Sequence, residues 1–284
     1  MSAAASRPKK DLSVTALYTS QVWRWGGLSE ADLFDTPQAR SVFGAVNGAL
    51  AISRLLVRGR PSLRHSLLHR HAMIDALWAR SGVPQVLELA CGLARRGAAA
   101  TADPEITYVE VDRPHVIDAK RALLARTERG RAILARPNLN LVPGDATMDA
   151  LDTFVDPSRP TFVIAEGLLM YLSAADQRLL WRRVAELYTR SGGTFVFDLV
   201  PACEQPAPGR IARALGFVMR RFTGGHGLVR DARGRADIRA ELLAAGFADV
   251  ETIEPRDVAA SFALPHPDAR TQQLVFVCRR AAAT

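Results

Sequence analysis

Short apolar runs that end at turn-forming or acidic residues recur along the middle of the chain. They occupy residues 85–90, 106–112, 139–145, 161–167 and 193–200. Near-continuous apolar runs of this length are typical of strands that are buried on both faces of a parallel sheet. Two weaker runs, at 249–255 and 271–280, predict a pair of antiparallel strands near the end of the chain.

Amphipathic segments separate several of these runs. Apolar residues recur at helical spacing in residues 115–130, 174–193 and 236–247, and a glycine lies near the end of each segment. This spacing places the apolar residues on one face of a helix. Alternating strands and helices predict an α/β fold in which helices cover both faces of a mostly parallel sheet.

The first 84 residues precede the first predicted strand. They are expected to be mostly helical, with a long helix from about His65 to Arg80. We expect residues 1–84 to form a helical cap over the ligand-binding edge of the sheet, and residues 85–284 to form the core. Residues 201–235 are rich in Pro, Gly and Arg and interrupt the alternation after the fifth strand. Such a segment is typical of a loop and helix on the substrate side of a site.

The composition is that of a globular chain. Of its 284 residues 48% are hydrophobic, which is enough to form a sizeable core. No uncharged apolar run reaches the ~18 residues of a membrane span, and the basic start lacks the apolar segment of a secretory signal. Cys91, Cys203 and Cys278 form no CxxC pair, so we expect a reduced protein of the cytoplasm.

The formal net charge of +8 raises the question of nucleic-acid binding. The 37 Lys and Arg residues are mostly isolated arginines scattered along the chain. We therefore expect no nucleic-acid partner and a small-molecule substrate, with the positive charge favouring an anionic one. His65, His69 and His71 lack an HExxH pattern, so no metal site is predicted. The oligomeric state stays open.

The first predicted strand runs into a turn of small residues in VLELACGLARRG (86–97). Glycine allows a tight turn and a close approach of a ligand to the backbone, at the strand end where open parallel sheets bind ligands. A bound nucleotide is one interpretation, and an ordinary strand-to-helix turn is the other. The dinucleotide pattern GxGxxG is missing, because Ala90, Gly92 and Arg95 stand in its frame, which disfavours a nicotinamide cofactor.

Four acidic residues lie at or near the ends of four successive predicted strands: Glu88, Asp112, Asp145 and Glu166. Asp112 comes about twenty residues after the turn, where a carboxylate can accept hydrogen bonds from both hydroxyls of a ribose. An acidic rim suits a ligand with hydroxyls, an exocyclic amine and positive charge, such as S-adenosylmethionine, and would repel the pyrophosphate of a dinucleotide. The alternative is that each acid caps a helix, as Asp112 could do for a helix that begins at Pro114.

Six segments carry a likeness to a known family: residues 14–43, RHAMID (70–75), QVLELACG (85–92), YVEVDRPHVIDAKRALL (108–124), GDAT (144–147) and AEGLLMYL (165–172). Together they resemble the leucine carboxyl methyltransferase superfamily, and within it the bacterial polyketide and small-molecule O-methyltransferases. The likeness covers most of residues 14–200. At the turn this chain has ACG followed by LARR, where the family commonly has GAG followed by DTR.

The resemblance implies a class I methyltransferase fold with a Rossmann-like, seven-stranded, mostly parallel sheet and S-adenosyl-L-methionine as the cofactor. It implies that Arg70 holds the methionine carboxylate of that cofactor and that Glu166 faces its ammonium group. The other cofactor residues it implies are the turn residues Ala90 and Gly92 with Glu88 nearby, Asp112 for the ribose, and Asp145 with Ala146 for the adenine. The turn keeps its shape if Ala90 retains a negative φ.

Methyl transfer mainly requires that the acceptor be held in line with the departing sulfur. Tyr18, Trp23 and Met170 are candidates to line an aromatic or polyketide-like pocket, and Arg24 is a candidate to bind an acidic substrate. Packing of the cap onto the sheet is the alternative role for the aromatic residues. A carboxylate acceptor needs no base at neutral pH, whereas a hydroxyl acceptor would use one. His226 and Tyr171 are the candidate catalytic residues.

The sequence thus predicts an S-adenosylmethionine-dependent O-methyltransferase. Its expected acceptor is a carboxylate or hydroxyl of a small molecule, in polyketide-like secondary metabolism. Two alternatives stay open: an NAD(P)-dependent oxidoreductase, and a methyltransferase-like protein that binds without catalysis.

Overall fold

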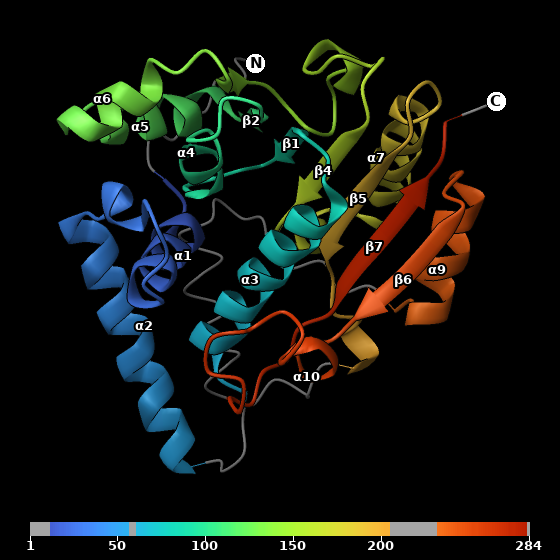
Figure 1. Ribbon diagram of the computed structural model, residues 1–284. Helices are drawn as coiled ribbons and strands as arrows, with labels where there is room; N and C mark the ends of the chain where they lie inside the picture. Colours follow the sequence, from blue (N-terminus) through green and yellow to red (C-terminus); the bar gives the residue numbers. More distant parts are fainter. Residues whose placement is uncertain (1–11, 57–60, 205–231, 283–284) are drawn as a thin grey trace, which may run out of the picture.

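The strands form one twisted sheet. The fold is described from a computed structural model over residues 12–56, 61–204 and 232–282. In these ranges the sheet has seven strands in the order β3-β2-β1-β4-β5-β7-β6 (Figure 1). They are β1 (Gln85–Leu89), β2 (Thr107–Asp112), β3 (Leu139–Pro143), β4 (Thr161–Ala165), β5 (Gly193–Asp198), β6 (Asp249–Ile253) and β7 (Val275–Arg280).

Strands β1 to β5 pair in parallel, and β7 runs antiparallel to both β5 and β6. All seven strand predictions and the mostly parallel sheet are therefore confirmed.

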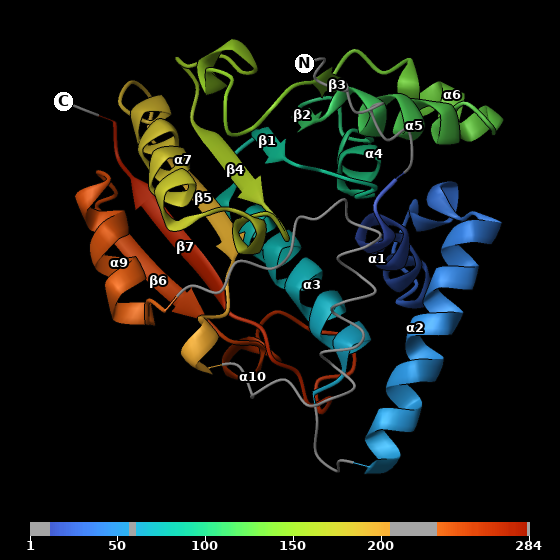
Figure 2. The same cartoon turned by 180° about the vertical axis from the view of Figure 1, so that it is seen from behind.

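Helices cover both faces of this sheet. Because successive side chains along a strand point to opposite faces, each central strand contributes to two apolar clusters. Val86 and Phe162 belong to a cluster with residues of α3 (Leu63–Ser81) and α5 (Pro114–Leu124). Leu87 and Val163 belong to a second cluster with residues of α7 (Ala174–Leu187) and α9 (Arg235–Ala244). Figures 1 and 2 show these two helical layers from opposite sides of the sheet.

The prediction of a single helix over residues 115–130 is wrong. The segment contains the end of one helix and the start of another. The helix α5 ends at Leu124, and α6 (Glu128–Leu134) begins after Thr127, whose backbone is extended and whose hydroxyl accepts a hydrogen bond from Gly130 N at 3.0 Å. A Cβ at Gly130 would lie 1.9 Å from the Leu124 carbonyl oxygen, so the close approach of the two helices requires glycine. Leu124 and Ile133 are both in one core cluster, which is why the apolar spacing does not reveal the break.

The N-terminal region is helical, as predicted. It contains α1 (Val14–Trp25), the 3-10 helix η1 (Ala31–Phe34), α2 (Pro37–Leu56) and α3, which corresponds to the long helix predicted from about residue 65 to 80. The helices α1 and α2 pack against each other, while α3 lies on the sheet with Met73 and Ile74 in the core. In the described residues, no helix is both long and apolar enough to span a bilayer. The expected division into cap and core at residue 84 stays a prediction.

One edge of the sheet gathers the chain segments that matter for function. It contains the carboxyl ends of β1 to β6 and the start of β7, because β7 runs the opposite way. The short elements at or between the strands are α4 (Arg96–Ala100), α10 (Pro255–Val258) and the 3-10 helices η2 (Leu151–Thr153), η3 (Leu169–Tyr171) and η4 (Ala202–Glu204). Most of the predicted insert at 201–235 lies outside the described residues.

Candidate functional site

The turn after β1 is held against the end of β2. Ala90 and Gly92 both have left-handed backbone conformations, with φ of 53° and 52°. Gly92 N donates a hydrogen bond to Asp112 Oδ2 at 2.7 Å, and Arg113 N donates to Asp112 Oδ1 at 2.7 Å. Ala90 therefore does not meet the condition of a negative φ under which the turn was expected to keep its shape. The chain must reverse directly after the strand, and an alanine adopts there a conformation that glycine adopts without strain.

Asp112 does not cap the following helix. The residue before the first turn of α5 is Arg113, and no side chain caps that helix terminus. Burial raises the pKa of Asp112, although the Gly92 and Arg113 N–H groups partly counteract this effect. The carboxylate therefore links the glycine turn to the second strand, at the position that the sequence assigns to ribose recognition.

Asp145 and Ala146 follow β3 at the same edge. Asp145 Oδ1 accepts hydrogen bonds from the Thr147 hydroxyl at 2.6 Å and from Thr147 N at 2.9 Å. The Thr147 hydroxyl lowers the pKa of Asp145, which stays ionised at neutral pH. Ala146 is buried. The loop is thus ordered by its own aspartate, and a role in adenine recognition stays a prediction.

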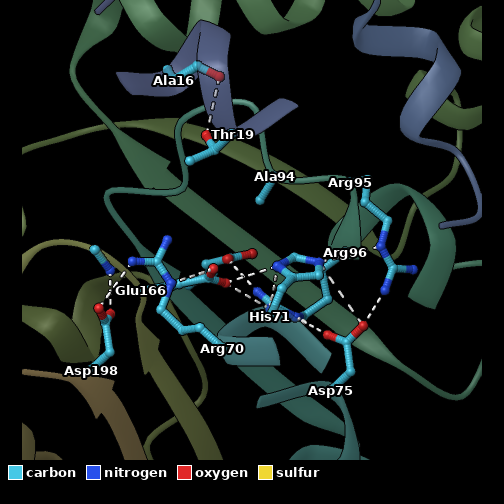
Figure 3. Close-up of polar contacts among 12 residues, drawn as sticks. Ala16, Thr19, Arg70, His71, Asp75, Ala94, Arg95, Arg96, Glu166 and Asp198 are labelled. Carbon is cyan, nitrogen blue, oxygen red and sulfur yellow. Dashed lines mark hydrogen bonds and ion pairs between the residues drawn. The ribbon is translucent and has the colours of Figure 1, made fainter. Parts of the chain in front are cut away.

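Arg70 joins the ends of β4 and β5 through two carboxylates. Its Nε donates to Glu166 Oε1 at 2.9 Å, and its Nη1 donates to Asp198 Oδ2 at 2.9 Å (Figure 3). Both acids and the arginine are almost completely buried. Burial alone would raise the pKa of Glu166, but His71, Arg70 and Arg96 hold it well below its usual range. Arg70 and Glu166 are therefore a charged pair, and their roles at the carboxylate and ammonium of a cofactor stay predictions.

His71 extends this buried network toward α4. Arg95 Nε donates to His71 Nε2 at 3.3 Å, and His71 Nδ1 lies 2.9 Å from Glu166 Oε2. Burial and the Arg96 charge lower the pKa of His71, so its ring is neutral. Arg96 Nη2 lies 2.9 Å from the same Nδ1, so this ring nitrogen faces both a guanidinium and the Glu166 carboxylate. Asp75 accepts from both Arg95 and Arg96, which completes the network (Figure 3).

Glu88 lies inside the core. Its carboxylate accepts from Arg96 Nη1 and, at 2.8 Å, from the Tyr108 hydroxyl, and only 1% of the residue is exposed. Burial raises the pKa of Glu88 to about 7, with the nearby Glu110 adding to the shift and Arg96 opposing it. Glu88 thus lies one residue before the end of β1, where it supports the buried network through Arg96.

The candidate substrate residues of α1 are engaged in packing. Tyr18 is stacked on Phe43 and donates from its hydroxyl to Asn47 Oδ1 at 3.2 Å. Trp23 is 3% exposed and stacks on the His71 ring at a centroid distance of 4.1 Å. Both contacts fit the packing alternative, and their role in lining a substrate pocket stays a prediction.

The other candidates are distributed around the same region. Arg24 forms an ion pair with Asp35 and is partly exposed. Met170 packs against the core cluster on the α7 face, and the Tyr171 hydroxyl lies 3.5 Å from Thr15 Oγ1 of α1. His226 lies outside the described residues.

Sequence reasoning missed Asp198, His71, Asp75 and the two arginines Arg95 and Arg96. Asp198 carries the same signal as the four predicted acids, since it is the last residue of β5. His71 and Asp75 lie within the recognised RHAMID segment, and the arginine pair lies in LARR. The contacts of the two arginines with His71, Asp75 and Glu166 span 20 or more positions in the chain, so no local pattern reveals them.

A cavity of about 580 Å³ lies at the other half of the same edge, beside the ends of β5 and β6 and the start of β7. His69, the residue immediately before Arg70 on α3, borders this cavity, as do Val200, Arg235 and Thr271. His69 Nε2 is 2.7 Å from the Pro265 carbonyl oxygen, and burial lowers the pKa of His69. In the described residues no group of His, Cys, Asp or Glu is arranged to hold a metal ion.

The fold is that of the class I methyltransferases. A "putative methyltransferase" from Thermobifida fusca has the same fold, with a TM-score of 0.57, 18% identity and coverage of 99% of this chain and 100% of that one. An O-methyltransferase family protein from Burkholderia thailandensis aligns with a TM-score of 0.53, 16% identity and coverage of 95% and 73%.

The sequence model of the leucine carboxyl methyltransferase family matches residues 31–185, which is more than half of the chain. The chain therefore belongs to the leucine carboxyl methyltransferase family.

Curated relatives share part of this chain. One named "Putative S-adenosyl-L-methionine-dependent methyltransferase", from Mycolicibacterium paratuberculosis, is 34% identical over 123 residues, which are 43% of this chain and 41% of the relative. A relative of the same description from Parafrankia is 30% identical over 187 residues, which are 61% and 58%. The matched segments thus span less than two thirds of the length of these relatives.

Proposed function

We propose that this protein is an S-adenosyl-L-methionine-dependent O-methyltransferase. It transfers a methyl group to a carboxylate or hydroxyl of a small molecule, in the cytoplasm and in polyketide-like secondary metabolism. The observation that carries the proposal is the buried Arg70–Glu166 pair at the strand edge, next to the turn held by Asp112. Family membership and the description of the curated relatives support it.

The residues at the edge fit the proposed cofactor by their chemistry. An arginine and an ionised carboxylate, 2.9 Å apart, match the two opposite charges of an amino acid group. Asp112 is a carboxylate suited to ribose hydroxyls, and Asp145 one suited to an exocyclic amine. Among the described residues a Cβ on Gly92 would meet Ala16 of α1 alone, at 3.7 Å, so the glycine leaves space between the turn and α1.

S-adenosylmethionine supplies a methyl group that its sulfonium already activates. The contribution of the chain is then to orient the cofactor and the acceptor and to exclude water from the site. Arg70, Glu166 and Asp112 would fix the cofactor, and α1 covers the turn through Ala16. A carboxylate acceptor needs only orientation, whereas a hydroxyl acceptor would use Tyr171 or His226 as its base.

A small-molecule acceptor is supported by the cavity next to His69, whose volume is in the usual range for such sites. The net charge of +8 favours an anionic acceptor, and the scatter of the arginines along the chain argues against a nucleic-acid partner. The proposed acceptor contacts stay Tyr18, Trp23, Arg24 and Met170, which are not among the described residues that line this cavity.

The test of the cofactor is calorimetric titration with S-adenosylmethionine, S-adenosylhomocysteine and NAD. We expect micromolar binding of the first two and none of NAD. Binding of NAD alone would favour an oxidoreductase, and cofactor binding without turnover of any acceptor would favour the non-catalytic alternative.

Two variants test the assigned residues. Asp112→Ala and Arg70→Ala should each weaken S-adenosylmethionine binding by about 1–3 kcal/mol, because each removes a partner of a polar ligand group. Asp118→Ala is the matched control, since Asp118 is an exposed carboxylate on the neighbouring helix α5. Unchanged affinity in folded Asp112→Ala would remove that residue from the site.

A further inference from the structure

Asp198 is a buried acid whose two oxygens serve different parts of the site. It is the last residue of β5 and is 1% exposed. Its Oδ2 accepts a hydrogen bond from Arg70 Nη1 at 2.9 Å, and its Oδ1 accepts one from Gly167 N at 2.6 Å. One carboxylate therefore connects helix α3 to the loop that follows β4.

The Arg70 guanidinium is held along two of its edges. Glu166 accepts a hydrogen bond from Nε and Asp198 accepts one from Nη1, as Figure 3 shows. A guanidinium is planar, so partners on two sides fix both its position and its rotation. Among the described residues the Nη2 group has no hydrogen-bond partner, so its donors can serve an anionic ligand group.

Gly167 brings the loop backbone close to this guanidinium. Its φ is 70°, and a Cβ at this position would lie 3.4 Å from both Arg70 Nη1 and Nη2. The hydrogen bond from Gly167 N to Asp198 holds the loop in this place. Asp198 thus sets the distance between Arg70 and the loop that carries Glu166.

We propose that Asp198 is a positioning residue for the amino acid part of the cofactor. It orients Arg70 so that the remaining N–H donors meet the carboxylate of S-adenosylmethionine, and it keeps Glu166 beside the ammonium group. Asp198 itself does not touch the ligand. The inference rests on the proposed function, and it concerns only the part of the ligand beyond the adenosine.

The test compares two ligands that differ in that part. S-adenosylhomocysteine carries the amino acid group, whereas 5′-methylthioadenosine has the same adenosine and thioether but lacks it. In Asp198→Asn, which is close in shape and uncharged, we expect the affinity for S-adenosylhomocysteine to fall ten- to a hundredfold and that for 5′-methylthioadenosine to stay within about twofold. Asp118→Asn is the control and should change neither affinity.

If Asp198 had a merely structural role, Asp198→Asn would lower the affinity for both ligands together. That result, or an unchanged affinity for S-adenosylhomocysteine, would overturn the proposal. In a second step, Asp198→Asn is combined with Arg70→Ala. If Asp198 acts through Arg70, the double variant should bind S-adenosylhomocysteine as weakly as Arg70→Ala alone, so that Asp198→Asn adds no further loss once Arg70 is absent.

If Asp198→Asn fails to fold, Asp198→Glu is measured instead. It keeps the charge but moves it, and the same ligand-selective loss is expected. A wild-type protein that binds 5′-methylthioadenosine but not S-adenosylhomocysteine would overturn the positioning role alone. Failure of the wild type to bind either ligand would overturn the proposed function and this inference with it.

Discussion

Glu88 is a carboxylic acid in the core whose pKa burial raises to about 7, compared with 4.5 in the unfolded chain. Between these two pH values the folded protein binds more protons at this site than the unfolded protein does. The free energy of unfolding therefore falls as the pH rises from about 4.5 to 7 and is constant above that range as far as this group is concerned. A difference of this size corresponds to about 3 kcal/mol.

Glu88→Gln should remove this decline, because glutamine mimics the protonated acid and does not titrate. Urea unfolding of both proteins at pH 5, 6, 7 and 8 measures the difference in unfolding free energy. We expect the wild type to lose about 2–3 kcal/mol relative to Glu88→Gln across this range. Glu105→Gln, on the exposed chain before β2, should follow the wild type. Parallel pH profiles of wild type and Glu88→Gln would contradict the assignment.

Ala90 occupies a position that favours glycine. The left-handed conformation costs a side-chain residue about 1–2 kcal/mol, and the extra freedom of glycine in the unfolded chain offsets part of that gain. Ala90→Gly should therefore stabilise the protein by about 0.5–1 kcal/mol in chemical unfolding. Ala94→Gly in the same loop, where φ is not positive, should destabilise it by a similar amount. A loss of stability in Ala90→Gly would mean that the turn is not strained.

The partners of the acidic residues could not be predicted from the sequence. Glu88 and Glu166 look alike there, since each comes at the end of an apolar run. In the structure Glu88 lies inside β1 and is buried against Arg96, whereas Glu166 follows β4 and meets Arg70. This difference of two positions along the paired strands decides which acid reaches the edge, and strand boundaries are uncertain by at least that much from sequence.

At the scale of elements, the strands were predictable because each is a compact apolar run with turn residues at its end. The sheet buries both faces of its central strands, so the signal is strong. The break between α5 and α6 was not predictable, because it arises from a backbone contact at Gly130 that leaves the apolar spacing intact. Glycine within a helical pattern was the one available sign.

Gly130→Ala tests this explanation of the helix break. The added Cβ would lie 1.9 Å from the Leu124 carbonyl oxygen, so α6 must move away from α5. We expect a loss of about 2–3 kcal/mol in the free energy of unfolding, in spite of the higher helix propensity of alanine. Ala132→Ser, at an exposed position of the same helix, should change stability by less than about 0.5 kcal/mol. A more stable Gly130→Ala would show that the two helices can join.

At the scale of the whole molecule, the buried charges connect elements that are distant in the sequence. Arg70 and His71 of α3 reach Glu166 after β4, Asp198 reaches Arg70 from β5, and Arg96 reaches Glu88 in β1. Helix α1 adds a further link through the stacking of Trp23 on His71. A ligand at this edge would therefore stabilise the main core of the protein, and its binding should be visible in global unfolding.

Thermal unfolding with S-adenosylhomocysteine measures this coupling. A ligand at a hundred times its dissociation constant adds about 2.7 kcal/mol to the free energy of unfolding. For a chain of this size, Tm should rise by roughly 5–10 °C. NAD at the same concentration should leave Tm unchanged, and Arg70→Ala should show a smaller rise at the concentration used for the wild type. Since the buried charges connect β1, β4, β5 and α3, a ligand that binds beside them should raise Tm. A ligand that binds without raising Tm would have to bind the unfolded chain equally well, or bind elsewhere.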